Sequence, residues 1–225
     1  MYQDKRILAV IPGKKTSRRL PEKNLKSLAG RPLISYSVEQ AKNSTTVDRV
    51  ILSTDCDKLA YIGEAYGADI IKRPAELATD AATVEDVVLH VLESLPETYE
   101  IVVCLQPTSP LRFVADIDDA IRMLVDRPNV DSVVGVTLFR AAIVERKKGY
   151  IQYIVPETPE HYRANGTVYV SWNKRLKQFK SFYMPHTLPY IMPENRSIDI
   201  DTPFDFEVAE FFMRKRTGEE GVYKL

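Results

Sequence analysis

The sequence predicts an α/β fold, a three-layer sandwich in which helices cover both faces of a mainly parallel β-sheet. Short runs rich in Val, Ile and Leu alternate with longer segments of helical periodicity, the order expected of βαβ units. Most of these runs are continuously apolar, which is typical of strands buried on both faces. With 225 residues, 44% of them apolar, the chain can form one sizeable core, so we expect a single domain over residues 1–225.

Five segments have the composition of buried strands. They are Ile7–Ile11, Val47–Ser53, Ala68–Ile71, Ile101–Leu105 and Val130–Val136. Each is short, rich in β-branched residues and bounded by polar or turn-forming residues, as strands usually are. We expect them to form the central sheet.

Helices are expected between and after these strands. Apolar residues recur at helical spacing in Thr83–Leu95 and Val114–Asp126, and Leu59–Tyr66 is followed by a glycine, which often ends a helix. A last helix is expected from Thr202 to about Arg216, because Thr caps helix N-termini and the proline after it suits the first turn.

The pattern changes in the second half of the chain. Segments such as Tyr150–Val155 and Thr167–Ser171, among many Tyr, Phe and Pro residues, predict extended structure without a regular crossover helix. We interpret the region of about 137–193 as a small β-rich excursion from the domain. It would either cover an acceptor site or pair with another subunit.

The balance of charge limits the partners. Lys+Arg and Asp+Glu each number 31, so a general basic surface for nucleic acid is not expected, and any phosphate site must be local. No signal peptide or long apolar span is evident, so we expect no membrane partner and a cytoplasmic location. Cys56 and Cys104 lack metal-type spacing and are interpreted as reduced core thiols.

The segment from Ile11 to Asn24 is the first candidate site. It follows the first predicted strand, and five cations fall within ten positions: Lys14, Lys15, Arg18, Arg19 and Lys23. Ligands bind at the carboxyl ends of strands in open α/β sheets, where such cations would stabilise a triphosphate and a departing pyrophosphate. The segment matches neither G-x-G-x-x-G nor G-x-x-x-x-G-K-[ST], which disfavours a dinucleotide site and a P-loop. Taken alone, it also fits a solvated charged loop.

The segment Ser197–Phe206 is the second candidate site. Asp199 and Asp201 alternate along extended backbone, so both carboxylates should leave the same face. Two carboxylates near phosphates form a hard-oxygen site for Mg²⁺. A polar strand edge leading to a helix cap would have the same sequence.

The segment Leu105–Arg112 is the third candidate site. It follows a predicted buried strand, and its two prolines should hold a rigid loop that presents Gln106 and Ser109. A Gln amide both donates and accepts hydrogen bonds, which suits a sugar hydroxyl or carboxylate. A plain strand-to-helix connection is the alternative.

Together with shorter motifs, these segments resemble the acylneuraminate cytidylyltransferase family, the CMP-sialic acid synthetases and their bacterial relatives. In chain order the motifs are Leu20-Pro-Glu-Lys-Asn24, Ser53-Thr-Asp55, Arg73-Pro-Ala-Glu-Leu-Ala-Thr-Asp80, Leu105–Arg112, Arg163-Ala-Asn-Gly166 and Ser197–Thr202. The resemblance covers nearly the whole chain. It implies a Rossmann-like sheet with a dimerisation excursion, and hence a homodimer.

The resemblance also implies a reaction. It is the Mg²⁺-dependent transfer of a cytidylyl group from CTP to an acidic sugar, a nonulosonate such as sialic, legionaminic or pseudaminic acid, with release of pyrophosphate. By position, the nucleotide would be bound by Ile11, Gly13, Lys14, Ser17, Arg18, Lys23, Asn24 and Arg73. Of these residues, Lys14, Ser17, Arg18 and Lys23 would hold the phosphates.

The resemblance assigns the remaining roles to the other two segments. Asp199 and Asp201 would bind Mg²⁺, and Asp201 or its metal-bound water would help to deprotonate the acceptor, so Asp201 joins Lys14 and Lys23 as an expected catalytic residue. Gln106 would contact the sugar acid, with Arg163 and Asn165 nearby.

Two departures from the family pattern leave alternatives open. Gly13-Lys14 stand where Ala-Arg is usual, and lysine keeps the charge but loses the bidentate fork of arginine. Residues 137–146 lack the usual His-Pro-x-Lys-like acceptor segment. The chain could therefore serve a different acid, such as a phosphonate or a shorter keto-deoxy sugar acid. A catalytically silent nucleotide-binding homologue is the other alternative, and the joint presence of Lys23, Asp199 and Asp201 argues against it.

Overall fold

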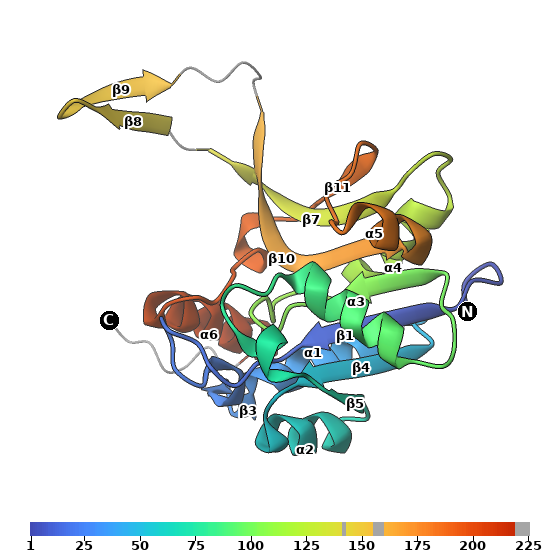
Figure 1. Ribbon diagram of the computed structural model, residues 1–225. Helices are drawn as coiled ribbons and strands as arrows, with labels where there is room; N and C mark the ends of the chain where they lie inside the picture. The colour runs from blue at the N-terminus through green and yellow to red at the C-terminus, as the bar shows by residue number, and fades with distance from the viewer. Residues whose placement is uncertain (141–142, 155–159, 219–225) are drawn as a thin grey trace.

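The central element of the fold is a seven-stranded sheet (Figure 1). The computed structural model describes residues 1–140, 143–154 and 160–218. From one edge to the other the strands are β11 (Thr187–Ile191), β7 (Ser132–Phe139), β10 (His161–Trp172), β6 (Ile101–Cys104), β1 (Ile7–Pro12), β4 (Arg49–Thr54) and β5 (Asp69–Lys72). Strand β10 is antiparallel to both neighbours, and all other pairs are parallel. The predicted mainly parallel sheet is confirmed.

Helices cover both faces of this sheet and bury its apolar residues. They are α1 (Leu33–Lys42), α2 (Asp57–Ala65), α3 (Val84–Ser94), α4 (Val114–Val125), α5 (Asn173–Phe179) and α6 (Pro203–Thr217). In β1, Ile7, Ala9 and Ile11 pack with α1, α2 and α4, whereas Leu8 and Val10 pack with α3 and α5. Because successive side chains of a strand leave opposite faces, the apolar runs supply two cores, one on each side. The result is the expected three-layer sandwich.

Capping residues fix where two helices begin. Thr83 Oγ1 accepts a hydrogen bond from the Asp86 N–H, and the Thr83 N–H donates one to the Asp86 carboxylate, which forms a capping box at α3. Thr202 and Asp205 form the same arrangement at α6, with Pro203 in the first turn as predicted. A third core cluster packs α6 against α1 and the short strand β2 (Ser27–Leu28), which pairs with β3 (Arg31–Pro32).

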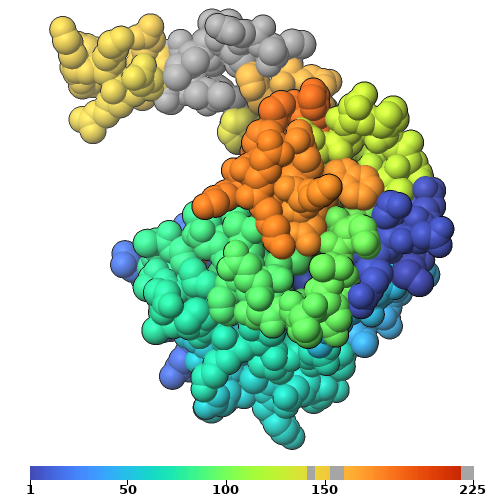
Figure 2. Space-filling model, turned by 45° about the vertical axis from the view of Figure 1, so that its right-hand side comes forward, coloured from blue at the N-terminus to red at the C-terminus, as the bar shows by residue number. Residues whose placement is uncertain are grey.

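The part that stands apart from the sheet is smaller than the excursion expected over residues 137–193. Strands β10 and β11 belong to the central sheet, and the short helix α5 lies between them. The antiparallel hairpin of β8 (Ile143–Lys147) and β9 (Tyr150–Ile154) projects from the body, as Figures 1 and 2 both show. The sequence pattern of β10 does not show that it joins a parallel sheet as an antiparallel strand. For this reason sequence patterns alone place it in the excursion.

Several loops converge at the carboxyl ends of β1, β5 and β6. The segment 13–26 leaves β1, the segment 73–83 leaves β5 and the loop 105–112 leaves β6.

Among the described residues, every helix is too short or too polar to cross a bilayer. Both cysteines are buried and free.

Candidate active site

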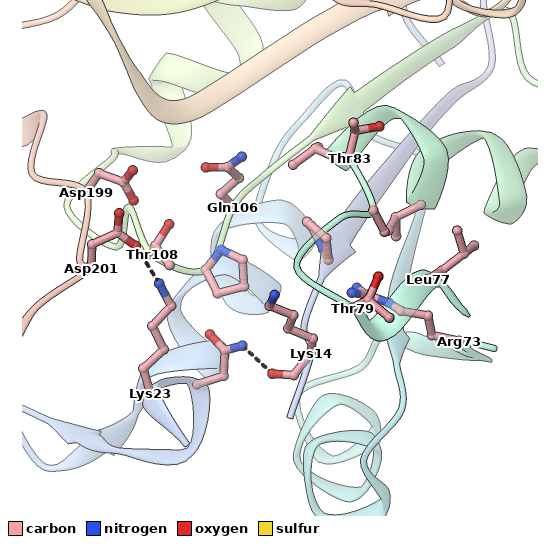
Figure 3. A pocket seen from close by; sticks show the side chains of 16 residues that line it. Lys14, Lys23, Arg73, Leu77, Thr79, Thr83, Gln106, Thr108, Asp199 and Asp201 are labelled. Carbon is pink, nitrogen blue, oxygen red and sulfur yellow. Dashed lines mark hydrogen bonds and ion pairs between the residues drawn. The ribbon is translucent and has the colours of Figure 1, made fainter. Parts of the chain in front are cut away.

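A pocket opens at this edge, and all three candidate segments contribute to it (Figure 3). Its lining comes from the loops after β1, β5 and β6, the start of α3 and the segment before α6. The lining residues are Pro12, Lys14, Lys23, Asn24, Arg73, Leu77, Thr79, Ala82, Thr83, Val84, Val87, Gln106, Pro107, Thr108, Asp199 and Asp201. Segments far apart in the sequence thus share one cavity.

Internal hydrogen bonds hold the cationic opening segment in place. The Gly13 N–H donates to the Ser53 carbonyl at 3.0 Å, and a Cβ at Gly13 would lie 2.9 Å from the Leu52 side chain, so the site admits only glycine without movement. The buried amide of Asn24 donates to the Lys14 carbonyl at 2.9 Å, which closes the segment on itself. The two lysines of the pocket, Lys14 and Lys23, therefore lie at fixed ends of one loop.

The acidic segment is held by the cap of α6 and by the loop after β6. The Asp201 N–H donates to Asp205, which forms the capping box of α6 with Thr202, and the Ile200 N–H donates to the Thr108 carbonyl at 2.8 Å. Ile200 is fully buried between the two aspartates. Since residues two apart in extended backbone point in the same direction, both carboxylates face the pocket, as predicted (Figure 3).

The cationic and acidic segments meet directly. Lys23 Nζ lies 3.0 Å from Asp201 Oδ1 and donates to the Ile200 carbonyl at 2.7 Å. Arg19 contacts the other oxygen of Asp201 at 2.6 Å. The Lys23 side chain is only 12% exposed, so its ion pair is shielded from solvent much more than that of Arg19, which is 66% exposed.

A second ion pair spans the other side of the pocket. Lys14 Nζ and Arg18 Nε each contact the Asp80 carboxylate at 2.6 Å. The hydrogen bond and charge of Lys14 hold the pKa of Asp80 below its ordinary value. Lys14, Arg18, Arg19 and Lys23 of the opening segment are thus paired with carboxylates of the chain.

Burial and neighbouring charge shift the pKa of two groups in the pocket. Asp199 reaches solvent through the open pocket, but the protein around it removes enough water to raise its pKa, and the charge of Asp201 raises it further. Arg73 is buried, donates to the Ser53 carbonyl at 2.8 Å, and has its pKa lowered by burial to about 10. It remains charged at neutral pH.

The donor set suits a hard divalent cation held jointly with a phosphate. Besides burial, the negative charge of Asp201 contributes to the raised pKa of Asp199. A cation placed between the two carboxylates would relieve this repulsion. No group of three or more His, Cys, Asp or Glu side chains able to hold a metal occurs among the described residues. Mg²⁺ commonly takes one or two protein carboxylates and completes its shell with water and substrate phosphate, so the residues fit Mg²⁺.

Gln106 lines the pocket and packs against the bulged part of β10. Gly166 has a φ of +70°, and a Cβ there would lie 2.6 Å from Gln106 Oε1 and 2.7 Å from Ser109 Oγ. The Ser109 hydroxyl donates to the Asn165 carbonyl at 2.8 Å. Glycine at position 166 therefore lets the Gln106 amide pack against the backbone of β10 and point into the pocket (Figure 3).

Several predicted site residues lie outside the pocket lining. Ile11 points into the core and Gly13 acts through its backbone. Ser17 does not line the pocket, and Arg18 is 87% exposed and reaches it only through Asp80. Arg163 is exposed on β10.

Asn165 is also turned away from the pocket. It is buried, its amide donates to Ser197 Oγ at 3.0 Å, and its oxygen accepts from Thr167. Its polar groups therefore support the fold between β10 and the acidic segment. Arg163 and Asn165 therefore do not line the pocket with Gln106, because motif spacing does not show which way a bulged strand turns its side chains. Their contact with an acceptor stays a prediction.

Thr108, which lines the pocket, and Asp80, which pairs with Lys14 of the pocket, were not singled out from the sequence. Thr108 hydrogen-bonds Asp199 and so links the loop after β6 to the acidic pair. Asp80 is the last residue of the Arg73–Asp80 motif, and its position opposite the cations appears only when β5 is placed beside β4.

Comparison with known proteins identifies the family. Residues 8–222 match the family model described as Cytidylyltransferase. The chain is 31% identical over 226 residues to an N-acylneuraminate cytidylyltransferase of Escherichia coli O18:K1:H7 (strain RS218 / NMEC), covering 96% of this chain and 54% of that protein. It therefore spans about half the length of that relative. It is also 32% identical over 230 residues to a CMP-N,N'-diacetyllegionaminic acid synthase of Legionella pneumophila subsp. pneumophila (strain Philadelphia 1 / ATCC 33152 / DSM 7513), covering 92% of this chain and 96% of that protein.

A solved structure shares the fold. A CMP:2-keto-3-deoxy-manno-octonic acid synthetase complexed with CTP superposes with a TM-score of 0.72 at 19% identity, covering 94% of this chain and 99% of that chain. The chain belongs to the cytidylyltransferase family. The resemblance and the enzyme class predicted from the sequence are confirmed.

Proposed function

We propose that this protein transfers a cytidylyl group from CTP to a nonulosonic acid, giving the CMP-sugar and pyrophosphate. The observation that carries the proposal is the contact of Lys23 with Asp201, which brings the cationic and acidic segments together in one pocket. The names of two similar proteins supply the acceptor class, since one acts on N-acylneuraminate and the other on a legionaminic acid.

The chain's own cations would position the triphosphate and stabilise the leaving group. Lys14 and Lys23 project into the pocket from opposite ends of the opening segment, while Asn24 fixes its backbone. As the acceptor hydroxyl oxygen bonds to the α-phosphorus, the bond from that phosphorus to the bridging oxygen breaks and the electron pair leaves with pyrophosphate. The two lysines would stabilise the charge that develops there.

The acidic pair has two proposed roles. Asp199 and Asp201 would hold Mg²⁺, which when bound supplies charge neutralisation of the phosphates. Asp201, whose carboxylate faces the cavity, would accept the proton that the acceptor hydroxyl loses. Gln106, which also lines the pocket, would hydrogen-bond the acceptor.

A panel of acceptors tests this function. Purified protein with CTP and Mg²⁺ is offered sialic, legionaminic and pseudaminic acids, a shorter keto-deoxy sugar acid and a phosphonate, and pyrophosphate release is measured. At least one nonulosonate should be the best acceptor, and Lys23→Ala should serve as the inactive control. Turnover only with the shorter acid or the phosphonate would overturn the proposed acceptor, and no turnover with any acceptor would overturn the proposed activity.

We also propose a cytoplasmic homodimer. The projecting β8–β9 hairpin exposes Tyr150 and Ile151, which are 80% and 74% exposed, and so offers apolar surface to a second copy. Two buried free thiols suit a reducing compartment, where CTP is also available. Sedimentation of the wild type and of Tyr150→Ser/Ile151→Ser should give a dimer and a monomer respectively, and a monomeric wild type would contradict the proposal.

A further inference from the structure

Arg112 is a fully buried cation that forms no ion pair with any carboxylate among the residues the structure describes. Its exposed fraction is 0%, and no ion pair of Arg112 occurs within the described parts of the chain. Burial lowers the pKa of Arg112 to about 10, so the guanidinium is still charged at neutral pH. A buried charge is tolerated only when hydrogen bonds replace its water, so the acceptors that surround it show what it holds in place.

The acceptors belong to three separate segments. Arg112 Nε donates to the Thr167 carbonyl of β10 at 2.7 Å. Nη1 donates to Ser37 Oγ at 2.7 Å and to Gln40 Oε1 at 3.1 Å, both on α1. Nη2 donates to the Gln106 carbonyl. The rigid fork of arginine thus joins α1, β10 and the loop after β6 at one point, which lysine could not reproduce.

The same loop carries groups on both sides of the pocket. The Gln106 amide points into the cavity and packs against Gly166, next to the Thr167 that Arg112 also holds. Further along, the Thr108 carbonyl accepts from the Ile200 N–H between the two aspartates. The guanidinium itself does not line the pocket, so it can act on a ligand only through these residues.

We propose that Arg112 is a positioning residue for the acceptor, fixing the Gln106 carbonyl so that the Gln106 amide faces the acceptor subsite. This role rests on the proposed function. CTP should depend on it much less, because Lys14, Asn24 and Arg73 come from other loops and make no hydrogen bond with Arg112.

The first test separates acceptor binding from nucleotide binding. In Arg112→Met we expect the KM for the acceptor to rise at least about tenfold, since a charged hydrogen bond to the loop is lost. The Kd for CTP should change by less than about twofold, and Arg112→Lys should recover part of the loss. In a Gln106→Ala background, Arg112→Met should add little, because the two residues act through one contact. Equal effects on acceptor and CTP, or full additivity, would overturn the proposal.

A control variant accounts for lost stability. Asp118 is another buried polar residue whose carboxylate accepts hydrogen bonds from Ser44, Thr45 and Thr46, and it does not line the pocket. Asp118→Asn should destabilise the fold without raising the acceptor KM. If Arg112→Met does not fold, Ser37→Ala removes one of the bonds to Arg112 and should raise the acceptor KM by a few fold. An unchanged acceptor KM in Ser37→Ala would then refute the role.

Hydrogen exchange decides the inference even if no acceptor is turned over. The Ser109 N–H donates to the Gln106 carbonyl at 3.2 Å, the same carbonyl that Arg112 holds, so its exchange rate reports on this loop. We expect exchange of the peptide covering residues 105–112 to be at least about tenfold faster in Arg112→Met, with no change in the peptides of α2. Unchanged exchange in that peptide would overturn the proposal. If the wild type turns over no acceptor but exchange is faster in Arg112→Met, the result counts only against the proposed activity.

Discussion

Replacing Asp201 with Asn removes one charge from the pocket and keeps the shape of the side chain. The amide oxygen of the substituted side chain would still accept from Lys23, whose second bond to the Ile200 carbonyl is untouched. The ion pair with Arg19 is lost, and the exposed fractions of its side chains are 66% for Arg19 and 35% for Asp201. Ion pairs exposed to this extent stabilise a protein by about 0–1 kcal/mol. For a chain of this length, the melting temperature should fall by less than about 4 °C.

The effect on the rate should be far larger than the effect on stability. Charge-stabilising groups in active sites contribute about 2.7–4 kcal/mol to the transition state, so kcat should drop by roughly 10²–10³-fold. Pyrophosphate release and thermal unfolding are measured on the same preparation. Asp119→Asn is the matched control, since it removes an exposed ion pair with Arg122 away from the pocket and should leave kcat unchanged. A variant Asp201→Asn with more than about a tenth of wild-type kcat would refute the assignment of Asp201.

Three further predictions follow from single contacts. Gly166→Ala should raise the acceptor KM and cost about 1–2 kcal/mol of stability, whereas Gly30→Ala, with φ of +82° and open space around it, should cost stability alone. Asp80→Asn should lower the KM for CTP by roughly two- to fivefold, because two paired cations become free for phosphate. Burial tends to raise the pKa of Asp118, but hydrogen bonds from residues 44–46 outweigh it and lower the pKa. The stability that Asp118 contributes should therefore be present above about pH 4 and lost at lower pH, and urea unfolding should show the difference from Asp118→Asn shrinking there.

The sheet could be predicted because its information is local. The apolar runs of β1, β4 and β6 carry enough hydrophobic surface for two cores, and their predicted positions agree with the structure within two residues. The start of α6 could also be predicted, since capping by Thr202 and the proline after it depends on local sequence.

Helix α1 was not predicted, because tertiary contacts override its local pattern. Ser35, Ser37 and Gln40 are buried, so the helix lacks the polar face that periodicity requires. The polar groups of Ser37 and Gln40 find partners on the loop before α4, including the Pro110 carbonyl that Gln40 contacts at 2.8 Å. Such pairing depends on residues about 70 positions away and leaves no mark on the local sequence.

The candidate site was predicted where charge alone identified it. The lysines and the aspartate pair converge as expected, because ends of parallel strands meet at one edge of the sheet. The absence of Arg163 and Asn165 from the pocket lining could not be predicted, because their orientation depends on the bulge in β10, which shifts the register between Ala164 and Tyr169.

The most direct test is the effect of Mg²⁺ on CTP binding, measured by calorimetry in the wild type and in Asp199→Asn/Asp201→Asn. If the acidic pair and the opening segment hold one metal-bound triphosphate, Mg²⁺ should tighten CTP binding at least about tenfold in the wild type and leave it almost unchanged in the double variant. Lys23→Ala should weaken CTP binding with or without Mg²⁺. An equal gain from Mg²⁺ in the wild type and the double variant would contradict the account.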